Sequence, residues 1–245
     1  LEQYGPEEVL FYAAQVLSKL MDSQDVAVYT VANGDYARLF SATSREARKL
    51  GNSIRYTDDS MAELYGELKE HRVYVNRNMT DNLPMMASAV YSEDNMQLIL
   101  MLWGIPWERM TLGESNRLTI VGYLIQNAVV RANHYLEALR NQRYVEGTKV
   151  LDEEAFTQLA KAFLDARDKG LTEYVLLEVQ AGESNYEQVA STLGSAIRQT
   201  DYLGILKGNR LYALLTNTGR DNVGGVIERF QKAGYACVID EEAIL

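Results

Sequence analysis

The segment IRQTDYLGILKGNRLYALLTN, residues 197–217, indicates the fold of the second half of the chain. An apolar run from Tyr202 to Leu206 is followed by another from Leu211 to Leu215, across a Lys-Gly-Asn-Arg turn. Two apolar runs joined by a short turn that contains Gly predict a β-hairpin. An Arg-x-x-Asp pattern, Arg198 and Asp201, stands directly before the first strand. The hairpin therefore has a charged pair at its base and basic and amide groups at its tip.

The sequence around this hairpin predicts alternating helices and strands. We expect helices at 152–168, 184–199 and 220–232 and strands at 172–180 and 235–240, besides the hairpin at 202–217. This alternation, with one antiparallel hairpin, predicts an α/β sandwich with a mixed sheet. The polar segment 140–150 contains a Gly and precedes all these elements. We therefore place a domain boundary there and divide the chain into domains 1–143 and 144–245.

The first half begins and ends with a helix and is rich in strands between them. We expect strands at 25–32, 37–43, 84–91 and 96–104, a helix at 60–71, and an Asn33-Gly34 hairpin turn. The first helix starts at Pro6 and has an apolar stripe, and the last starts near Glu114 and has another. The stripes consist of Val9, Leu10, Ala13, Val16, Leu17 and Leu20, and of Leu118, Val121, Ile125, Ala128, Ala132, Leu136 and Leu139.

This order of elements resembles a GAF/PAS-type sensor domain. The resemblance implies a GAF-like antiparallel sheet with flanking helices. In such domains the first and last helices often build dimers, so it also implies a homodimer. The other interpretation is that both stripes only cover the sheet, and the sequence leaves these two open.

Composition excludes several classes of protein. The net charge of −10 argues against a general binder of nucleic-acid polymers or of anionic membranes. A lone cysteine, Cys237, excludes an internal disulfide, and with only His71 and His134 beside it no zinc-ligand spacing is present. Cys237 lies in an apolar run and is expected in the core. No apolar run approaches the roughly 18 residues of a membrane span, so we expect a soluble segment. The chain starts without Met, as in part of a longer protein.

The hairpin and the Arg-x-x-Asp before it resemble the GGDEF domain of diguanylate cyclases, over roughly the last 95 residues. In that family Arg-x-x-Asp stands five residues before the catalytic turn and is the inhibitory site, which binds the product cyclic di-GMP. Here Asp201 is followed by YLGIL and then by KGNRL, so the offset matches. The resemblance implies a nucleotidyl-cyclase-like α/β sandwich.

The catalytic turn of the family, however, is missing. At the positions of Gly-Gly-Asp/Glu-Glu-Phe this chain has Lys207, Gly208, Asn209, Arg210 and Leu211. A cation where the family has a metal-ligating carboxylate repels Mg²⁺. The metal-binding run of the first strand reads LLEVQ, in which the acid is Glu178 and the next strand position on the same side is a Gln. We therefore expect a degenerate GGDEF domain with no catalytic residues, no metal and no cofactor.

The product-binding pattern, in contrast, is intact. If the helix reaches residue 199, Arg198 and Asp201 project from its end to one side. The planar fork of Arg suits guanine O6 and N7 or a pair of phosphate oxygens, and Asp suits the N1–H and N2–H₂ donors of guanine. The family has a second arginine on the helix after the hairpin, and Arg229 stands at the matching offset. We expect cyclic di-GMP to bind at Arg198, Asp201 and Arg229.

A short pattern such as Arg-x-x-Asp is often a local ion pair, and the chain contains its own control. RYTD, from Arg55 to Asp58, has the same spacing without the helix, strand and downstream arginine. Solvated charges are also the favoured interpretation of Lys207 and Arg210. The context of Arg198 and Asp201, and not the pattern itself, makes them the candidate site.

A GAF-like domain followed by a degenerate GGDEF domain with an intact Arg-x-x-Asp is similar to the PelD family. This resemblance implies a non-catalytic cyclic di-GMP receptor that regulates Pel-type exopolysaccharide biosynthesis. It implies partners among exopolysaccharide synthases or other Pel-type membrane components, and a place at the cytoplasmic face of the inner membrane. The family completes its site with another arginine, for which Arg131, Arg140 and Arg143 all remain open.

Two other functions stay open. In one, the GAF-like domain is a small-molecule sensor, with Tyr91, Trp103 and Trp107 as candidate pocket residues, and the second domain is a scaffold. Such aromatic residues belong to a core more often than to a pocket. In the other, the second domain keeps a residual cyclase activity, which the turn at Lys207–Leu211 argues against.

Overall fold

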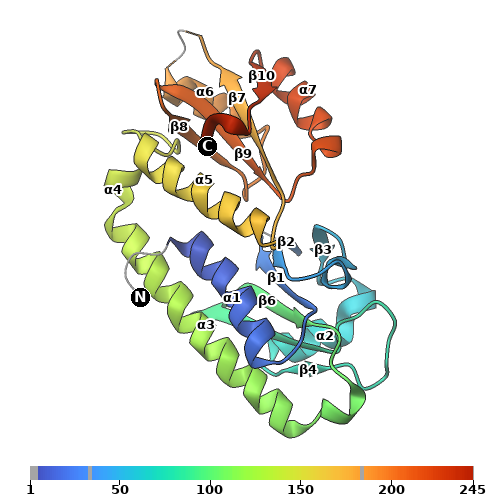
Figure 1. Ribbon diagram of the computed structural model, residues 1–245. Helices are drawn as coiled ribbons and strands as arrows, with labels where there is room; N and C mark the ends of the chain where they lie inside the picture. The colour runs from blue at the N-terminus through green and yellow to red at the C-terminus, as the bar shows by residue number, and fades with distance from the viewer. Residues whose placement is uncertain (1–4, 33–34, 183–184, 245) are drawn as a thin grey trace. The chain divides into compact units, whose positions relative to one another are not determined.

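The computed structural model describes residues 5–32, 35–182 and 185–244 (Figure 1). The chain divides into two compact units, Leu1–His134 and Tyr135–Leu245, so the division falls within the long helix α3 (Leu112–Ala138). The domain boundary at 143/144 stays a prediction. Within the described part of the chain, no helix is long and apolar enough to span a membrane.

The first unit is built on a six-stranded sheet in the order β3-β2-β1-β6-β5-β4, with every adjacent pair antiparallel. Its strands are β1 (Val26–Val31), β2 (Tyr36–Ala42), β3 (Ser53–Arg55), β4 (Tyr74–Val75), β5 (Met86–Ser92) and β6 (Asn95–Leu102). The four longer strands were predicted from the sequence, whereas the short β3 and β4 were not. The predicted Asn33-Gly34 turn lies outside the described residues.

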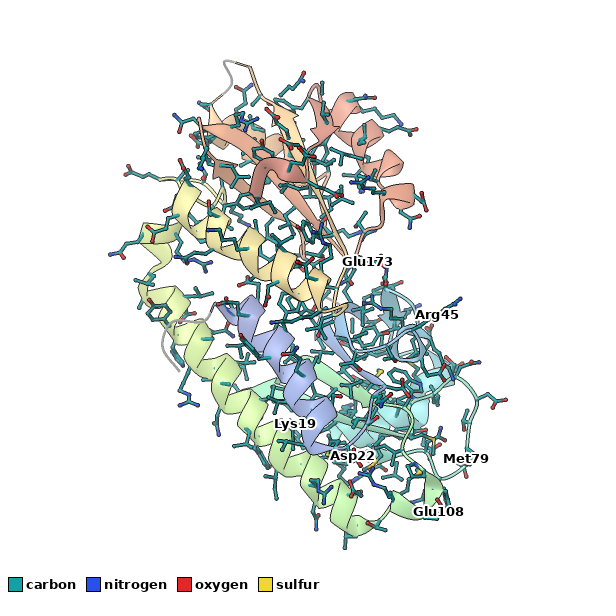
Figure 2. All side chains as sticks on the ribbon, viewed as in Figure 1. Lys19, Asp22, Arg45, Met79, Glu108 and Glu173 are labelled. Atoms are coloured by element: carbon teal, nitrogen blue, oxygen red, sulfur yellow. The ribbon has the colours of Figure 1, made fainter. Side chains whose placement is uncertain are left out.

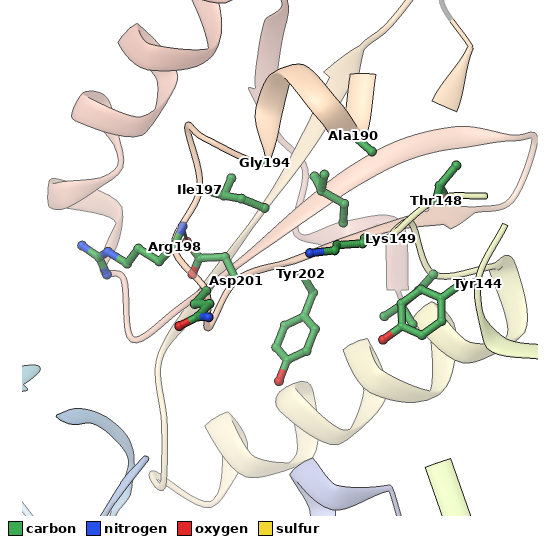
Figure 3. A pocket seen from close by; sticks show the side chains of 12 residues that line it. Tyr144, Thr148, Lys149, Ala190, Gly194, Ile197, Arg198, Asp201 and Tyr202 are labelled. Atoms are coloured by element: carbon green, nitrogen blue, oxygen red, sulfur yellow. Dashed lines mark hydrogen bonds between the residues drawn. The ribbon is translucent and has the colours of Figure 1, made fainter. Parts of the chain in front are cut away.

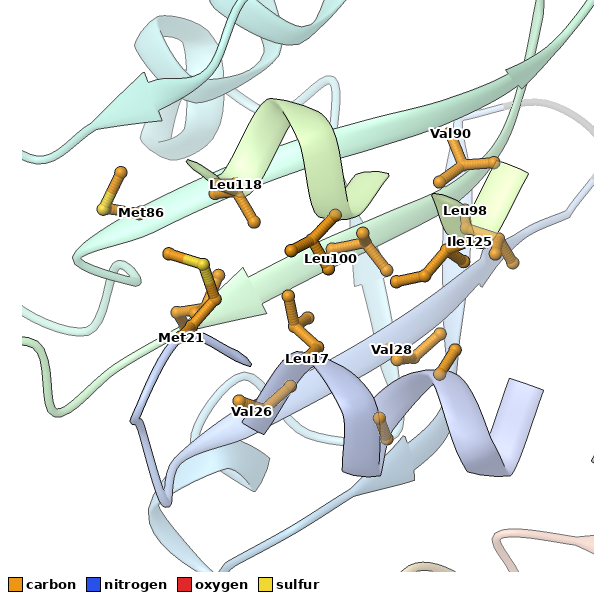
Figure 4. Close-up of a cluster of buried hydrophobic side chains, with 14 of the residues drawn as sticks. Leu17, Met21, Val26, Val28, Met86, Val90, Leu98, Leu100, Leu118 and Ile125 are labelled. Atoms are coloured by element: carbon orange, nitrogen blue, oxygen red, sulfur yellow. The ribbon is translucent and has the colours of Figure 1, made fainter. Parts of the chain in front are cut away.

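Two hydrophobic cores cover the two faces of this sheet. Along β1, Val26 and Val28 contribute to one core and Ala27 and Tyr29 to the other, as the two-residue period of a strand requires. The first core also contains side chains of α1 (Pro6–Leu20) and α3 (Figure 4), and the second contains those of α2 (Ala62–Lys69). Met79, in the loop between β4 and β5, is 55% exposed at the edge of this unit (Figure 2).

The apolar stripes of α1 and α3 cover the sheet within this unit. Leu17 of α1 and Leu118 and Ile125 of α3 are buried in the first core. The sequence left open whether the stripes form a dimer interface or cover the sheet. The buried residues of the stripes are explained by the second interpretation, because they pack on the sheet. Other apolar side chains on these helices are exposed: Tyr12, Leu112, Ile120, Tyr123, Leu124 and Tyr135, together with Val16 and Leu20 of the predicted stripe.

The second unit has a four-stranded sheet in the order β10-β7-β9-β8. Its elements are α4 (Arg140–Arg143), α5 (Glu153–Asp168), β7 (Tyr174–Gln180), α6 (Tyr186–Leu193), β8 (Tyr202–Leu206), β9 (Arg210–Thr216), α7 (Gly224–Lys232) and β10 (Ala236–Ile239). The prediction of a mixed sheet is wrong, because all its strand pairs are antiparallel. Among the described residues, parallel pairing occurs as an isolated bridge between Leu151 and Gly204.

Helices cover both faces of this second sheet, which makes the unit an α/β sandwich. Residues of α6 and α7, among them Val189 and Phe230, share a core with β7, β8 and β9. On the other side α5 packs on β8, where a Cβ atom at Gly204 would lie 2.1 Å from ring atoms of Phe156. Glycine at this position therefore allows α5 to approach the strand. The sequence predicted Cys237 in the core, but this side chain is half-buried on β10 and packs against the edge of the core.

Candidate nucleotide-binding site

The Arg-x-x-Asp of the second unit lies in a loop and not at the end of a helix. The predicted helix 184–199 is shorter, because α6 ends at Leu193 and turns follow to residue 200. The backbone N–H of Asp201 donates to the carbonyl of Arg198 at 3.0 Å, and the N–H of Arg198 donates to Asp201 Oδ2 at 2.9 Å. A reciprocally bonded turn, and not helix geometry, therefore holds the two residues together.

The Asp201 carboxylate also ties this turn to the sheet. Its Oδ1 accepts the backbone N–H of Thr216 at 3.0 Å and the Thr216 hydroxyl at 3.4 Å. Burial raises the pKa of Asp201, while these bonds and the charge of Arg198 act in the opposite direction. A carboxylate has about four acceptor positions, so Asp201 keeps capacity for a further donor. Its first role in the fold is to orient the loop.

The Arg198 side chain, by contrast, is left available. It is half-buried, and within the described residues its guanidinium forms no ion pair, not even with Asp201. In Figure 3 the Arg198 side chain extends away from Lys149, Tyr202 and Tyr144. Five N–H donors of a permanently charged group are thus presented beside a fixed turn.

A cavity of about 580 Å³ opens beside this turn, entirely within the second unit (Figure 3). Pockets of roughly 300–1,000 Å³ are the usual size for small-molecule ligands. It is lined by Tyr144, Thr148, Lys149, Leu151, Ala190, Gly194, Ile197, Arg198, Gln199, Asp201, Tyr202 and Leu203. The sequence singled out Arg198 and Asp201 of this set. It missed Lys149 and the tyrosines, since they belong to no pattern and only the fold brings Lys149 to the hairpin.

Arg229, the third predicted ligand residue, is not part of the cavity lining. It is exposed on α7, and its Nε donates to the carbonyl of Gly225 at 3.2 Å. Among the arginines left open, Arg131 is exposed on α3 and donates to the carbonyl of Asn127 at 3.1 Å. Arg143 ends α4 outside the cavity lining, and the side chain of Arg140 lies outside the described part. The roles of all four arginines stay predictions.

At the tip of the hairpin, the Arg210 guanidinium lies between the carboxylates of Glu178 and Asp240. The guanidinium of Arg210 lies 3.3 Å from Glu178 Oε2 and 3.9 Å from Asp240 Oδ2. The Tyr212 hydroxyl donates to Asp240 at 3.0 Å. Glu178, the one acid in the strand segment where the family binds metal, is thus paired with Arg210 of the same chain. Within the described residues, no cluster of three or more His, Cys, Asp or Glu side chains could hold a metal ion.

The first copy of the pattern, in the first unit, forms ion pairs. Arg55 donates to Asp35 at 3.3 Å, and its Nε lies 3.6 Å from Asp58 Oδ1. The hydrogen bond with Asp35 is the main cause that raises the pKa of Arg55. This guanidinium is therefore already engaged on the protein surface.

The first unit also has a cavity of its own, of about 570 Å³. Its lining includes Tyr56, Tyr65, Tyr91 and His71, and the His71 ring stacks on Tyr91 with the ring centres 3.9 Å apart. Burial raises the pKa of Tyr91 to about 12. Of the three aromatic residues proposed from the sequence, Tyr91 lines this cavity. The other two do not, because Trp103 is buried in the second core and Trp107 is 53% exposed.

No protein-family model and no curated protein matches the chain. Among solved structures, PelD from Pseudomonas aeruginosa PA14 in complex with c-di-GMP matches at 15% identity and a TM-score of 0.39, over 96% of this chain and 81% of that chain. This chain is similar to PelD. The second GAF domain of DevS from Mycobacterium smegmatis matches at 12% identity and a TM-score of 0.43, over 54% and 99% of the two chains. The coiled coil and GGDEF domain of DgcB from Caulobacter crescentus with c-di-GMP matches at 16% identity and a TM-score of 0.30, over 44% and 62%. The structure itself has an antiparallel sheet with flanking helices followed by an α/β sandwich.

Proposed function

We propose that the second unit is a non-catalytic receptor for cyclic di-GMP. The observation that carries this proposal is the division of roles between Arg198 and Asp201. Asp201 fixes the turn through backbone N–H groups, and the Arg198 guanidinium is left without an ion pair in the described residues, beside a cavity of about 580 Å³. An unpaired arginine on a rigid turn is suited to an anionic ligand.

The chemistry of the pair selects a guanine nucleotide among anions. Arg198 can donate two parallel hydrogen bonds to guanine O6 and N7 or to a phosphate, and each such contact contributes roughly 1–3 kcal/mol of discrimination. The remaining acceptor capacity of Asp201 suits the N1–H and N2–H₂ edge, which adenine lacks. Arg229, from α7, is proposed as the second arginine of the site.

Titration calorimetry with cyclic di-GMP tests this receptor. We expect the parent protein to bind cyclic di-GMP in preference to cyclic di-AMP. Arg198→Ala should weaken binding by about tenfold or more, since charge-assisted hydrogen bonds contribute roughly 1.5–3 kcal/mol each. Arg55→Ala, which removes the other copy of the pattern, is the matched control and should bind as the parent does. Parental affinity in Arg198→Ala would contradict the assignment.

The same proposal includes the loss of cyclase activity. The Arg210 guanidinium stands between Glu178 and Asp240, where a cation would have to compete with it for the two carboxylates. Incubation with GTP and Mg²⁺ should give no cyclic di-GMP above a control without protein. Product that increases linearly with protein concentration would establish a residual cyclase instead.

A second candidate function rests on the cavity of the first unit. Its size and its tyrosine and histidine lining suit a small polar ligand with an aromatic ring. In this function the first unit is the sensor and the second is a scaffold. Mass spectrometry of ligand released from the denatured protein, comparing the parent with Tyr91→Ala, distinguishes the two functions. A released molecule that Tyr91→Ala fails to retain would favour the sensor.

The output of the proposed receptor is regulation of Pel-type exopolysaccharide biosynthesis. We place it at the cytoplasmic face of the inner membrane, with an exopolysaccharide synthase or another Pel-type membrane component as partner. A homodimer is part of this proposal, and its interface would contain the exposed side chains Val16, Ile120 and Leu124. Light scattering should show a dimer that Leu124→Glu converts to a monomer, and a parent that remains monomeric at high concentration would count against it.

A further inference from the structure

The cavity beside Arg198 carries a second cation that the sequence did not indicate. Its charged lining consists of Arg198, Lys149 and Asp201, which is an excess of positive charge in a chain whose net charge is −10. In Figure 3 the Lys149 side chain extends into the cavity, with its nitrogen toward the end where Arg198 and Asp201 lie. Lys149 is exposed and forms no ion pair within the described part of the chain.

The backbone around Lys149 is fixed by its own hydrogen bonds. The N–H of Val145 donates to the carbonyl of Val150 at 2.9 Å, and the Thr148 hydroxyl donates to the carbonyl of Val145 at 2.8 Å. The N–H of Val150 donates to the Thr148 hydroxyl at 3.0 Å. Val150 is fully buried in the core. Lys149 is therefore flanked by a bonded threonine and a buried valine, so the base of its side chain has little freedom.

This short hairpin is in turn attached to the strand that follows the Arg-x-x-Asp turn. Leu151 N–H donates to the carbonyl of Leu203 at 2.9 Å, and Ile205 N–H donates to the carbonyl of Leu151 at 3.0 Å. The position of Lys149 relative to Asp201 is thus set by the two backbone bonds that Leu151 makes with β8. A cation held in this way loses less conformational entropy on binding than one on a free loop.

The walls of the cavity are partly aromatic. Tyr202 directly follows Asp201, and its ring packs edge-on against Phe163 of α5, with the centres 6.1 Å apart. Tyr144 contributes a second ring to the lining, 37% exposed. Aromatic faces beside cations suit a ligand that combines bases with phosphates.

We infer that Lys149 is a ligand-binding residue that pairs with a phosphate of the bound nucleotide. The inference rests on the proposed cyclic di-GMP receptor and assigns it a residue outside the Arg-x-x-Asp pattern. A cyclic dinucleotide has two phosphodiester groups, each with one negative charge. Lys149 extends into the cavity, and the Arg198 side chain extends from the lining on the far side of the turn, so each can meet one phosphate, with Asp201 left to face the donors of a base. Lysine acts here as a point charge, without the fixed fork of arginine.

Calorimetry with cyclic di-GMP at several NaCl concentrations tests this role. Lys149→Ala should weaken binding by roughly tenfold, the effect of one charge-assisted contact at an accessible site. Its affinity should also depend less steeply on NaCl than that of the parent, because one screened charge pair is lost. Lys149→Arg should restore most of the affinity. A purely structural role of Lys149 would change the Tm and leave the salt dependence as it is.

Lys161→Ala, which removes an exposed lysine of α5 outside the cavity, is the matched control and should bind as the parent does. Parental affinity and salt dependence in Lys149→Ala, with loss of affinity in Arg198→Ala, would overturn the role of Lys149 and leave the receptor standing. No binding of cyclic di-GMP by the parent would overturn the receptor and this inference with it.

Discussion

Arg55–Asp58 and Arg198–Asp201 share the pattern Arg-x-x-Asp, yet their aspartates bind different partners. In the first copy Asp58 and Asp35 both face the guanidinium of Arg55, which is thereby engaged. In the second, Asp201 accepts backbone N–H groups, and its own arginine makes no ion pair in the described residues. The bonds of the aspartate, and not the spacing, decide whether the arginine is available to a ligand.

The largest loss of stability is expected from Gly204→Ala, which disturbs the packing of β8 next to Arg198–Asp201 and leaves Arg55–Asp58 unchanged. A Cβ atom at this position would lie 2.1 Å from the ring of Phe156, and neither β8 nor the buried ring can move away freely. We expect a loss of about 3 kcal/mol or more, at the upper end of overpacked cores. Thermal denaturation should show a much lower Tm for the second unit.

Gly225→Ala provides the control for this substitution. Gly225 lies in α7, and a Cβ atom there meets nothing within 4 Å. The change should raise stability by up to about 1 kcal/mol, the helix-propensity difference between glycine and alanine. Equal Tm values for Gly204→Ala and the parent would mean that α5 does not pack closely on β8.

Asp201→Ala should be the next in size, and Asp58→Ala should have almost no effect. Removing the Asp201 carboxylate leaves the N–H groups of Arg198 and Thr216 without partners, at about 1–3 kcal/mol for each buried donor. Relief of the buried charge offsets part of this loss, so we expect about 2 kcal/mol in urea unfolding. Asp58 is an exposed partner of Arg55, and its truncation should leave the unfolding midpoint unchanged. Comparable losses of unfolding free energy in Asp201→Ala and Asp58→Ala would show that the two aspartates do not differ in their structural role.

The sequence predicted the elements that carry strong local signals. The apolar runs and the Gly-containing turn gave the hairpin of β8 and β9, with Gly208 and Asn209 at φ values of 78° and 57° in its turn. The end of α6 was missed because Ala196 and Ile197 continue the helical spacing of Val189 and Leu193. Both belong to or pack against the same core, although the chain has already left the helix at Gly194. Burial in the tertiary fold, not helix periodicity, explains those two apolar residues.

The site was predictable only in part for the same physical reason. Arg198 and Asp201 are close in sequence, so a pattern could find them. Lys149 is brought to them through the bonds of Leu151 with β8, a long-range pairing with no local signal. An antiparallel sheet in place of the expected mixed one reflects the same limit, because hydrophobic periodicity indicates strands and not their neighbours.

The affinity for cyclic di-GMP should change several-fold with pH. Burial raises the pKa of Asp201, and only the ionised carboxylate accepts from both donors of a guanine edge. Affinity for cyclic di-GMP should therefore fall as the pH is lowered toward this raised pKa, at a higher pH than an ordinary aspartate near 3.9 would require. A pKa raised on folding favours the folded state at low pH, and this contribution is lost as the pH rises through that pKa. Titration of Asp201 therefore does not unfold the protein in the acidic range.

Calorimetry from pH 7 downward checks this prediction, with Asp201→Asn as the comparison. Asparagine keeps one acceptor for the N–H of Thr216 and has no charge to lose, so its weaker binding should be nearly independent of pH in this range. The same pH dependence in both proteins would show that another group is responsible.

The smallest effect is expected from Arg55→Ala. Its side chain is 50% exposed and forms ion pairs with Asp35 and Asp58, and such surface pairs contribute little because solvent screens them and side-chain entropy opposes them. The Tm should stay within the error of the measurement, and cyclic di-GMP should bind with parental affinity. Double substitution with Arg198→Ala should give the sum of the single effects, since sites without shared partners are additive. A measurable coupling between Arg55 and Arg198 would mean that the first copy takes part in binding, and the contrast between the two copies would then fail.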